Sequence, residues 1–165
     1  FGLVPQLKSR VISRTTKLRL CKTLIRPVLT YGSETWTLTR ALEEDLRSFE
    51  RKVLRRILGA TCDPEELTWR RRTNQEVMDL YKDWDVIRFI KVGRLRWAGH
   101  VARMNPQEPP RKILDEKIHA KRRIGRPKLR WLDCVTSDHT NSLRQETGEQ
   151  QHKTERTGGY HYRRP

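Results

Sequence analysis

The chain has 165 residues, with 36 Lys and Arg against 20 Asp and Glu, which gives a formal net charge of +16. Hydrophobic residues make up 35% and charged residues 34%, so we expect a thin core built from amphipathic elements. A charge surplus of this size is offset most naturally by a polyanion. A membrane surface is the weaker candidate, because no uncharged apolar run is long enough to span a bilayer. We expect no signal peptide, since Lys8 and Arg10 interrupt the N-terminal apolar residues.

The first predicted helix covers residues 15–31. Its apolar residues recur at i, i+3, i+4, i+7 and i+8, the spacing of a helix face that packs on a core. These residues are Cys21, Leu24, Ile25, Val28 and Leu29. Pro27 has no backbone N–H, so it should kink or divide the helix. We expect a break over residues 31–33.

The second predicted helix, residues 40–58, has the clearest boundaries. Thr39 can cap its start, and Gly59 can supply a left-handed stop. Acidic residues in its first turns and basic residues in its last turns complement the helix dipole. For the basic end, this dipole role and phosphate binding are alternatives of equal weight. The expected buried stripe is Leu42, Leu46, Phe49, Val53 and Ile57.

Two further helices are predicted next. Thr73 begins a capping box with Glu76, which predicts a short helix directly after a run of arginines. The side chains expected to point inward are Val77, Leu80 and Tyr81. Asp85 should cap a fourth helix that extends to about residue 104. The fourth helix has an apolar side with Ile87, Ile90, Ala98 and Val101, and a polar stripe with Arg96, His100 and Arg103.

Beyond the fourth helix the helical pattern weakens. Residues 105–110 are proline-rich and predict a linker. Three short segments follow: a helix over 113–119, a basic run over 121–128, and a helix over 129–135 with Trp131 turned inward. After about residue 141 the polar composition predicts a disordered tail. The expected fold class is all-α, with small amphipathic helices in an incomplete bundle, a basic linker and a disordered tail.

Three blocks combine aromatic residues with Arg and Gly at fixed offsets. The blocks run from Tyr31 to Trp36, from Arg94 to Val101 and from Gly125 to Trp131. Each Trp can anchor a thin core or stack on a base, and the core role is favoured. The adjacent Arg side chains suit phosphates, because a guanidinium fork matches a pair of phosphate oxygens.

The Gly125-Arg126-Pro127 tripeptide in the last block resembles an AT-hook. In such a hook, an extended Arg-Pro segment lies in the minor groove of A·T-rich DNA. A basic loop leading into a helix and general phosphate contact are the alternatives for this segment.

Catalytic residues are not expected in this chain. A polymerase palm needs paired aspartates that hold two Mg²⁺ ions, and the sequence has no adjacent Asp pair. No phosphate-cradling glycine loop or activated nucleophile is recognisable. Cys21, Cys62 and Cys134 are expected to be small buried side chains in a reducing compartment, with Cys134 and His139 only a fragment of a zinc-knuckle pattern. We therefore expect no metal, cofactor or enzymatic activity in this chain alone.

The order and spacing of the aromatic and basic blocks resemble the region after the palm in insect-type non-LTR (LINE-like) retrotransposon endonuclease/reverse transcriptases. The resemblance covers most of the chain, up to about Asp138. Its matching runs are residues 7–10, 17–18, 31–36, 49–54, 69–73, 95–104 and 125–133. Several blocks that match in order are more specific than any one of them.

In such proteins an endonuclease nicks target DNA, and the reverse transcriptase extends the nicked end on the element's RNA. The resemblance implies that residues 7–60 belong to a helical, thumb-like part that grips the template–primer duplex. It implies that the endonuclease and the Mg²⁺-binding palm lie before Phe1. Four segments are then expected: a thumb-like segment over 1–60, a second helical module over 61–104, a proline-rich and basic linker with a short helix over 105–140, and a tail over 141–165.

The leading hypothesis is a nucleic-acid-binding fragment of a retrotransposon RNA-directed DNA polymerase without its endonuclease and palm. Its partners would be RNA and DNA, bound through phosphates, in the nucleus or a cytoplasmic ribonucleoprotein. The alternatives are a host-retained DNA-binding or scaffold protein that uses the Gly-Arg-Pro segment, and a non-functional pseudogene product. The predicted binding residues are Arg51, Lys52, Arg55, Arg56, Arg70, Arg71, Arg72, Arg94, Arg96, Arg103, Lys121, Arg122, Arg123, Arg126, Lys128 and Arg130.

Overall fold

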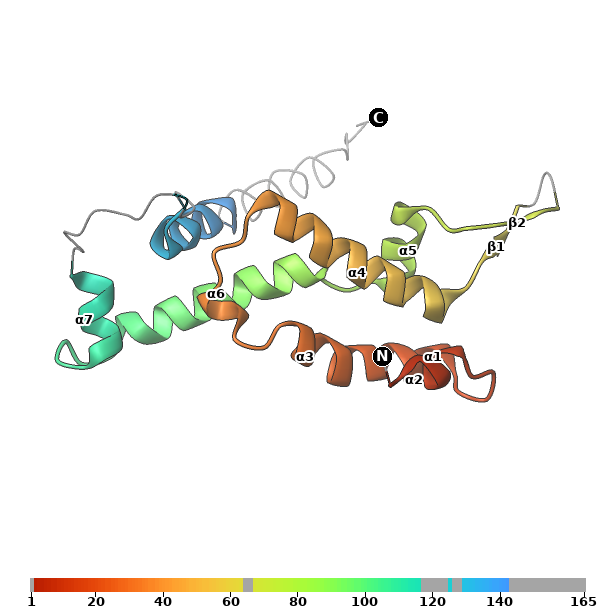
Figure 1. Ribbon diagram of the computed structural model, residues 1–165, viewed down its shortest axis with the longest axis horizontal. Helices are drawn as coiled ribbons and strands as arrows, with labels where there is room; N and C mark the ends of the chain where they lie inside the picture. Colours follow the sequence, from red (N-terminus) through yellow and green to blue (C-terminus); the bar gives the residue numbers. More distant parts are fainter. Residues whose placement is uncertain (1, 64–66, 117–124, 126–128, 143–165) are drawn as a thin grey trace, which may run out of the picture. The chain divides into compact units, whose positions relative to one another are not determined.

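The structure is a computed structural model that describes residues 2–63, 67–116, 125 and 129–142 (Figure 1). The described residues are mainly helical, so the all-α prediction is confirmed. They belong to two compact units, Phe1–Gly93 and Arg94–Pro165. The predicted disordered tail lies outside the described residues from residue 143 onward. The four predicted segment boundaries stay predictions.

The first unit opens with short helices: α1 (Val4–Lys8), α2 (Arg14–Leu20), the π-helical turn η1 (Cys21–Ile25) and α3 (Arg26–Leu29). The predicted single helix is thus divided just before Pro27. Pro27 cannot donate a backbone hydrogen bond, and the wider π turn precedes it. The extra residue of this turn rotates the helix face. Leu24 and Val28, which were predicted to be buried, are therefore 46% and 80% exposed.

A 3₁₀ turn, η2 (Ser33–Thr35), leads to the long helix α4 (Arg40–Leu58), whose bounds match the prediction. The Thr39 hydroxyl accepts a hydrogen bond from the Leu42 N–H at 3.3 Å, which confirms the cap. Gly59 has a φ of 74°, where a side chain would be strained, so it ends the helix as expected. Figure 1 shows α4 running alongside the α2–α3 segment.

The buried face of α4 agrees with the predicted stripe only in part. Leu46, Val53 and Ile57 are buried as predicted. Leu42 is exposed instead, and Phe49 is half-buried. The face extends to further residues that the simple stripe omitted: Glu50, Leu54 and Leu58. A helix buried on several sides shows a wider apolar arc than a single stripe.

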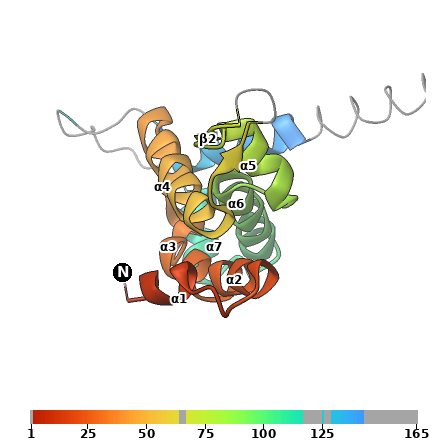
Figure 2. The same ribbon diagram turned by 90° about the vertical axis from the view of Figure 1, so that its right-hand side faces the viewer.

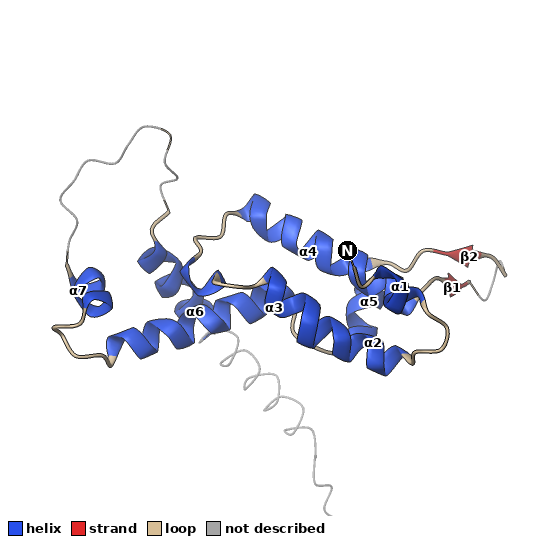
Figure 3. Ribbon diagram, turned by 60° about the horizontal axis from the view of Figure 1, so that its bottom comes forward, coloured by secondary structure: helices blue, strands red, loops and turns tan. Residues whose placement is uncertain are grey.

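A small antiparallel pair that was not predicted follows α4: β1 (Thr61–Cys62) and β2 (Trp69–Arg70). Two-residue strands are too short to show an alternating pattern in the sequence. Figure 3 shows this pair beyond the end of α4. Cys62 is exposed here, so the prediction that all three cysteines are buried was wrong for this residue.

Helix α5 (Asn74–Tyr81) begins with both hydrogen bonds of the predicted capping box. Val77 and Tyr81 are buried as predicted, whereas Leu80 is 45% exposed. Helix α6 (Val86–Ala102) is capped by Asp85, whose Oδ1 accepts from the Arg88 N–H at 2.8 Å. Figure 2 shows α5 beside α4, with α1 and α2 on another side of α4.

Helix α4 contributes to each of three apolar clusters in the first unit. The first is Leu7, Cys21, Ile25, Val53 and Ile57. The second is Leu38, Leu46, Val86, Ile87 and Ile90, with Trp36 packed against it as the core role of that Trp predicts. The third is Leu54, Leu58, Val77 and Tyr81. Because α4 contributes residues to all three clusters, it fixes the positions of the elements that pack against it and of the loops that follow its ends.

A buried polar network further stabilises the packing of α4 against its neighbouring helices. The Arg26 guanidinium donates to Glu50 Oε1 at 3.4 Å, to the Trp84 carbonyl at 2.9 Å and to the Tyr81 hydroxyl. The second Glu50 oxygen accepts from the Val86 N–H at 2.9 Å, at the start of α6. Burial raises the pKa values of both Glu50 and Tyr81 above their usual range. The network joins α3, α4 and α5 to the first turn of α6.

The second unit contains the end of α6, helix α7 (Pro109–Asp115) and a helix over residues 131–142. Helix α7 starts inside the predicted linker, because Pro is well suited to the first turn of a helix. The C-terminal helix is longer than the predicted 129–135, and Trp131 is half-buried in it. Arg94 and Asp138 form a buried ion pair that links this helix to α6.

Candidate nucleic-acid interface

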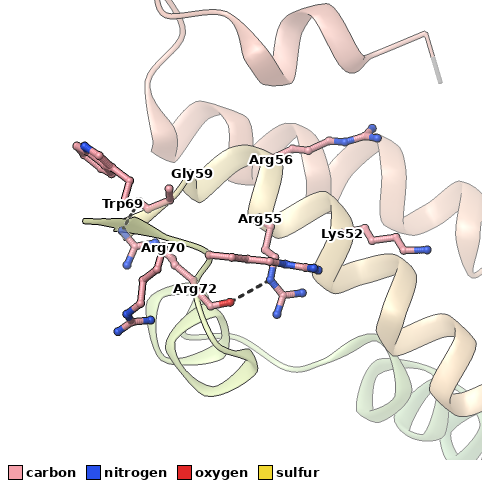
Figure 4. Close-up of a pocket in the computed structure, with 9 residues that line it drawn as sticks. Lys52, Arg55, Arg56, Gly59, Trp69, Arg70 and Arg72 are labelled. Carbon is pink, nitrogen blue, oxygen red and sulfur yellow. Dashed lines mark hydrogen bonds between the residues drawn. The ribbon is translucent and has the colours of Figure 1, made fainter. Parts of the chain in front are cut away.

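Two of the predicted basic clusters line one hollow of about 400 Å³ at the C-terminal end of α4 (Figure 4). We name it the basic pocket. Its lining residues are Lys52, Arg55, Arg56, Gly59, Ala60, Trp69, Arg70, Arg71 and Arg72. The pocket lies wholly in the first unit. It brings together the basic residues of α4 and the arginine run, which the segment containing β1 and its loop separates in the sequence.

Local structure explains why these clusters meet. The three basic residues from α4 lie at i, i+3 and i+4, so they share one side of the helix. Gly59 then turns the chain away from the helix axis. The antiparallel pairing of Thr61 with Arg70 returns the chain toward α4. The arginine run therefore lies next to the helix end.

Arg70 anchors the pocket. Its guanidinium donates to both carboxylate oxygens of Glu76, at 2.7 and 3.1 Å, and to Asp63 at 3.2 Å. These hydrogen bonds lower the pKa of Glu76 to about 2, with a further contribution from the Thr73 N–H. Since two carboxylates already compensate its charge, Arg70 fits a positioning role better than phosphate contact.

Arg55 and Arg72 are the half-buried arginines that line the pocket without a carboxylate partner in the described residues. Arg55 Nε donates to the Arg72 carbonyl at 3.2 Å (Figure 4). The terminal nitrogen of Arg55 donates to Asn74 Oδ1 at 2.6 Å. Arg72 donates to the Ala60 carbonyl at 3.3 Å, while its buried Nε has no hydrogen-bond partner among the described residues. Burial, together with the charges of Arg71 and Arg51, lowers the pKa of Arg55. Neither arginine has a carboxylate partner in the described part of the chain.

Three further cations face the solvent around the pocket: Lys52, Arg56 and Arg71. None of them forms an ion pair within the described ranges. Together with Arg55 and Arg72 they make five positive groups that no acidic side chain of the described residues compensates. Guanidinium and ammonium groups in this density attract phosphate oxygens.

Trp69 completes the lining as its aromatic member. Its side chain is 76% exposed, and Figure 4 shows it at the opposite end of the pocket from Lys52. Trp69 lies outside the three aromatic and basic blocks of the sequence and was not predicted as a binding residue. The signal available was its position directly before the arginine run, since an aromatic residue beside clustered cations suits nucleic acid.

The remaining predicted binding residues fall into different environments. Arg51 pairs with Glu44 at 2.7 Å and lowers the pKa of that carboxyl. Arg94 is only 1% exposed and pairs with Asp138, so it does not fit the predicted contact with phosphates. The exposed members in the second unit are Arg96, Arg103 and Arg130. Outside the described residues lie Lys121, Arg122, Arg123, Arg126 and Lys128, so only Gly125 of the AT-hook-like tripeptide is described.

No group of three or more His, Cys, Asp or Glu side chains in the described part of the chain is arranged to hold a metal ion. None of its helices is both long enough and apolar enough to cross a membrane.

Comparison with known proteins adds one finding. The chain is 31% identical, over 131 residues, to a transposon-derived protein of Caenorhabditis elegans. The match covers 79% of this chain and 46% of that protein, so the chain spans about half the length of the relative. No protein-family model and no solved structure matches the chain. The similarity supports a transposon-related origin.

Proposed function

We propose that the chain binds nucleic acid through the basic pocket, as the thumb and downstream part of a non-LTR retrotransposon reverse transcriptase. The observation that carries this proposal is the set of five cations that no carboxylate of the described residues compensates. A polyanion offsets such a set better than the chain's own acidic residues do. The similarity to a transposon-derived protein supports the retrotransposon part of this proposal.

The expected partners are RNA and DNA, and the expected contacts are to phosphates. Phosphate contacts hold a strand in register without reading its sequence, so binding should show little sequence preference. The proposed role is binding without polymerisation, with the catalytic palm on a preceding segment and the protein in the nucleus or a cytoplasmic ribonucleoprotein.

The test is a fluorescence anisotropy titration of a labelled duplex at increasing salt. Release of counterions from about five neutralised phosphates should weaken binding roughly 10²- to 10³-fold between about 50 and 200 mM salt. The triple variant Lys52→Ala, Arg56→Ala, Arg71→Ala should weaken binding and flatten the salt dependence. These side chains are open to solvent, so the variant should keep its fold, which circular dichroism checks.

A matched control removes the same charge from another part of the first unit. Arg10, Arg14 and Arg19 are exposed and form no ion pair within the described ranges. Their triple Ala variant should bind almost as the wild type does. Equal weakening by both triple variants would assign the affinity to net charge alone and reject the pocket as the site.

A further inference from the structure

We propose that the basic pocket takes an unpaired nucleotide, with its base stacked on Trp69 and its phosphates on the adjoining cations. The inference rests on the proposed function and refines it, because it names a single-stranded segment or strand end as the preferred ligand. A duplex would then bind more weakly at the same site.

The Trp69 side chain is largely exposed to solvent. An indole that is 76% exposed belongs to none of the three apolar clusters of the first unit. A large apolar side chain left in water is informative, because burying it in a complex is favourable. Trp69 therefore contributes little to the core and is free to meet a ligand.

The backbone that carries Trp69 is held in place by contacts of its neighbours. Trp69 lies on β2, opposite Cys62 on β1. The next residue, Arg70, is hydrogen-bonded to Asp63 and to Glu76 of α5. Successive residues of a strand point to opposite faces, so these contacts of Arg70 leave the indole uncovered. A fixed backbone reduces the conformational entropy that is lost on binding.

Basic side chains line the same pocket as the indole ring. Arg71 and Arg72 follow it in the sequence, and Arg55 lies across the pocket. The hollow of about 400 Å³ falls in the size range of small-molecule sites. Stacking platforms next to phosphate-binding cations are the arrangement by which proteins hold single strands without reading their sequence.

Single strands and duplexes differ in whether a base can stack on Trp69. Inside a duplex each base is stacked on its neighbours and paired through its edge, so its flat face is not available to an indole. An unpaired base exposes that face and can lie on an aromatic ring. The basic groups would attract both kinds of nucleic acid, but only the unpaired strand can also use Trp69.

The experiment compares an unstructured thymidine strand of about 20 nucleotides, long enough to cover such a site, with a blunt duplex of the same length. The variants are Trp69→Ala, Trp69→Phe and, as control, Trp84→Ala. Trp84 is also exposed and lies in the first unit, but it does not line the pocket. All four proteins are titrated by anisotropy, and intrinsic fluorescence is followed with unlabelled strand.

Trp69→Ala should weaken binding of the single strand about 5- to 100-fold, with a change of about twofold or less for the duplex. Trp69→Phe should keep most of the affinity, since it retains a ring, but should lose the quenching of indole fluorescence that is expected when the wild type binds the strand. Trp84→Ala should match the wild type.

Equal losses for strand and duplex, or no loss for either, would overturn the stacking proposal. In both of these cases the salt-dependent binding by the wild type would still stand as the proposed function. Salt-insensitive binding by the wild type would instead reject the proposed function and the stacking proposal together.

Discussion

At the scale of single residues, the role of each cation depends on its neighbours. Arg70 and Arg71 are adjacent in the sequence, yet Arg70 is bound to two carboxylates while Arg71 has none in the described part of the chain. Arg94 is enclosed with Asp138, which lies 44 residues away. Composition and spacing predicted a basic surface, but they could not rank its members, because the acidic partners lie from 6 to 44 residues away and are chosen by the fold.

The cysteines give a prediction at this scale. Cys62 is exposed on β1 opposite Trp69, whereas Cys21 and Cys134 are buried. Burial also raises the pKa of Cys21 to about 11, which leaves little reactive thiolate at neutral pH. Maleimide should therefore add rapidly to Cys62 alone in the native protein, and to all three thiols in denaturant.

Intact-mass spectrometry measures the number of adducts, and Cys62→Ser is the control that should abolish the fast step. Prior addition of nucleic acid should slow labelling of Cys62, because Cys62 is the β1 partner of Trp69 in the strand pair. Rapid addition to two or three thiols without denaturant would contradict the buried positions of Cys21 and Cys134.

At the scale of elements, helix ends were the most predictable features. The Thr39 cap, the Gly59 stop, the Thr73–Glu76 capping box and the Asp85 cap all act within four residues of sequence. Such local chemistry is visible without a fold. The π turn before Pro27 was predicted only as a kink or break. The resulting rotation of the helix face exposes Val28. This rotation depends on the tertiary packing of the turn, which the local sequence does not show.

The Arg70–Glu76 contact gives a prediction for the β2–α5 connection. The folded-state pKa of Glu76 is about 2, below its ordinary value of 4.5. The stabilisation from this carboxylate is therefore fully present above pH 4.5 and is lost as the pH falls toward 2. Glu76→Gln should lower stability at neutral pH and reduce the loss of stability over this acidic range.

Urea unfolding at a series of pH values measures this effect. Gln keeps an oxygen for the Thr73 N–H, so the variant tests the charge rather than the cap. Asp45→Asn is a matched control, since Asp45 is an exposed carboxylate without an ion pair in the described ranges, and its stability at neutral pH should change by less than about 0.5 kcal/mol. An unchanged profile in Glu76→Gln would show that the contact with Arg70 contributes nothing.

At the scale of the whole first unit, the buried network around Arg26 holds the helices together. Arg26 is followed by Pro27 and preceded by the π turn, so the irregularity of the backbone places its side chain inward. Glu50, Tyr81 and Trp84 all depend on it for a hydrogen bond. No sequence rule predicts a buried Arg or Glu here, because each is tolerated only when the other is present.

Arg26→Ala should therefore destabilise the protein by about 3–5 kcal/mol, because it leaves the Glu50 carboxylate buried without its partner. Chemical denaturation followed by far-UV circular dichroism measures the change. Arg19→Ala removes an exposed arginine from the neighbouring α2 and should change stability by less than about 0.5 kcal/mol. Similar small effects of both substitutions would argue against the network as a stabilising element.

The sequence alone determined the helical class, the bounds of α4, the helix caps and the excess of positive charge, because each follows from local propensity or composition. Only the tertiary structure decided which cations share a pocket, which are paired and which Trp stays exposed. Those outcomes depend on contacts between residues far apart in the chain, such as Arg55 with Asn74 and Arg26 with Tyr81. Packing sets these contacts, and local pattern does not encode them.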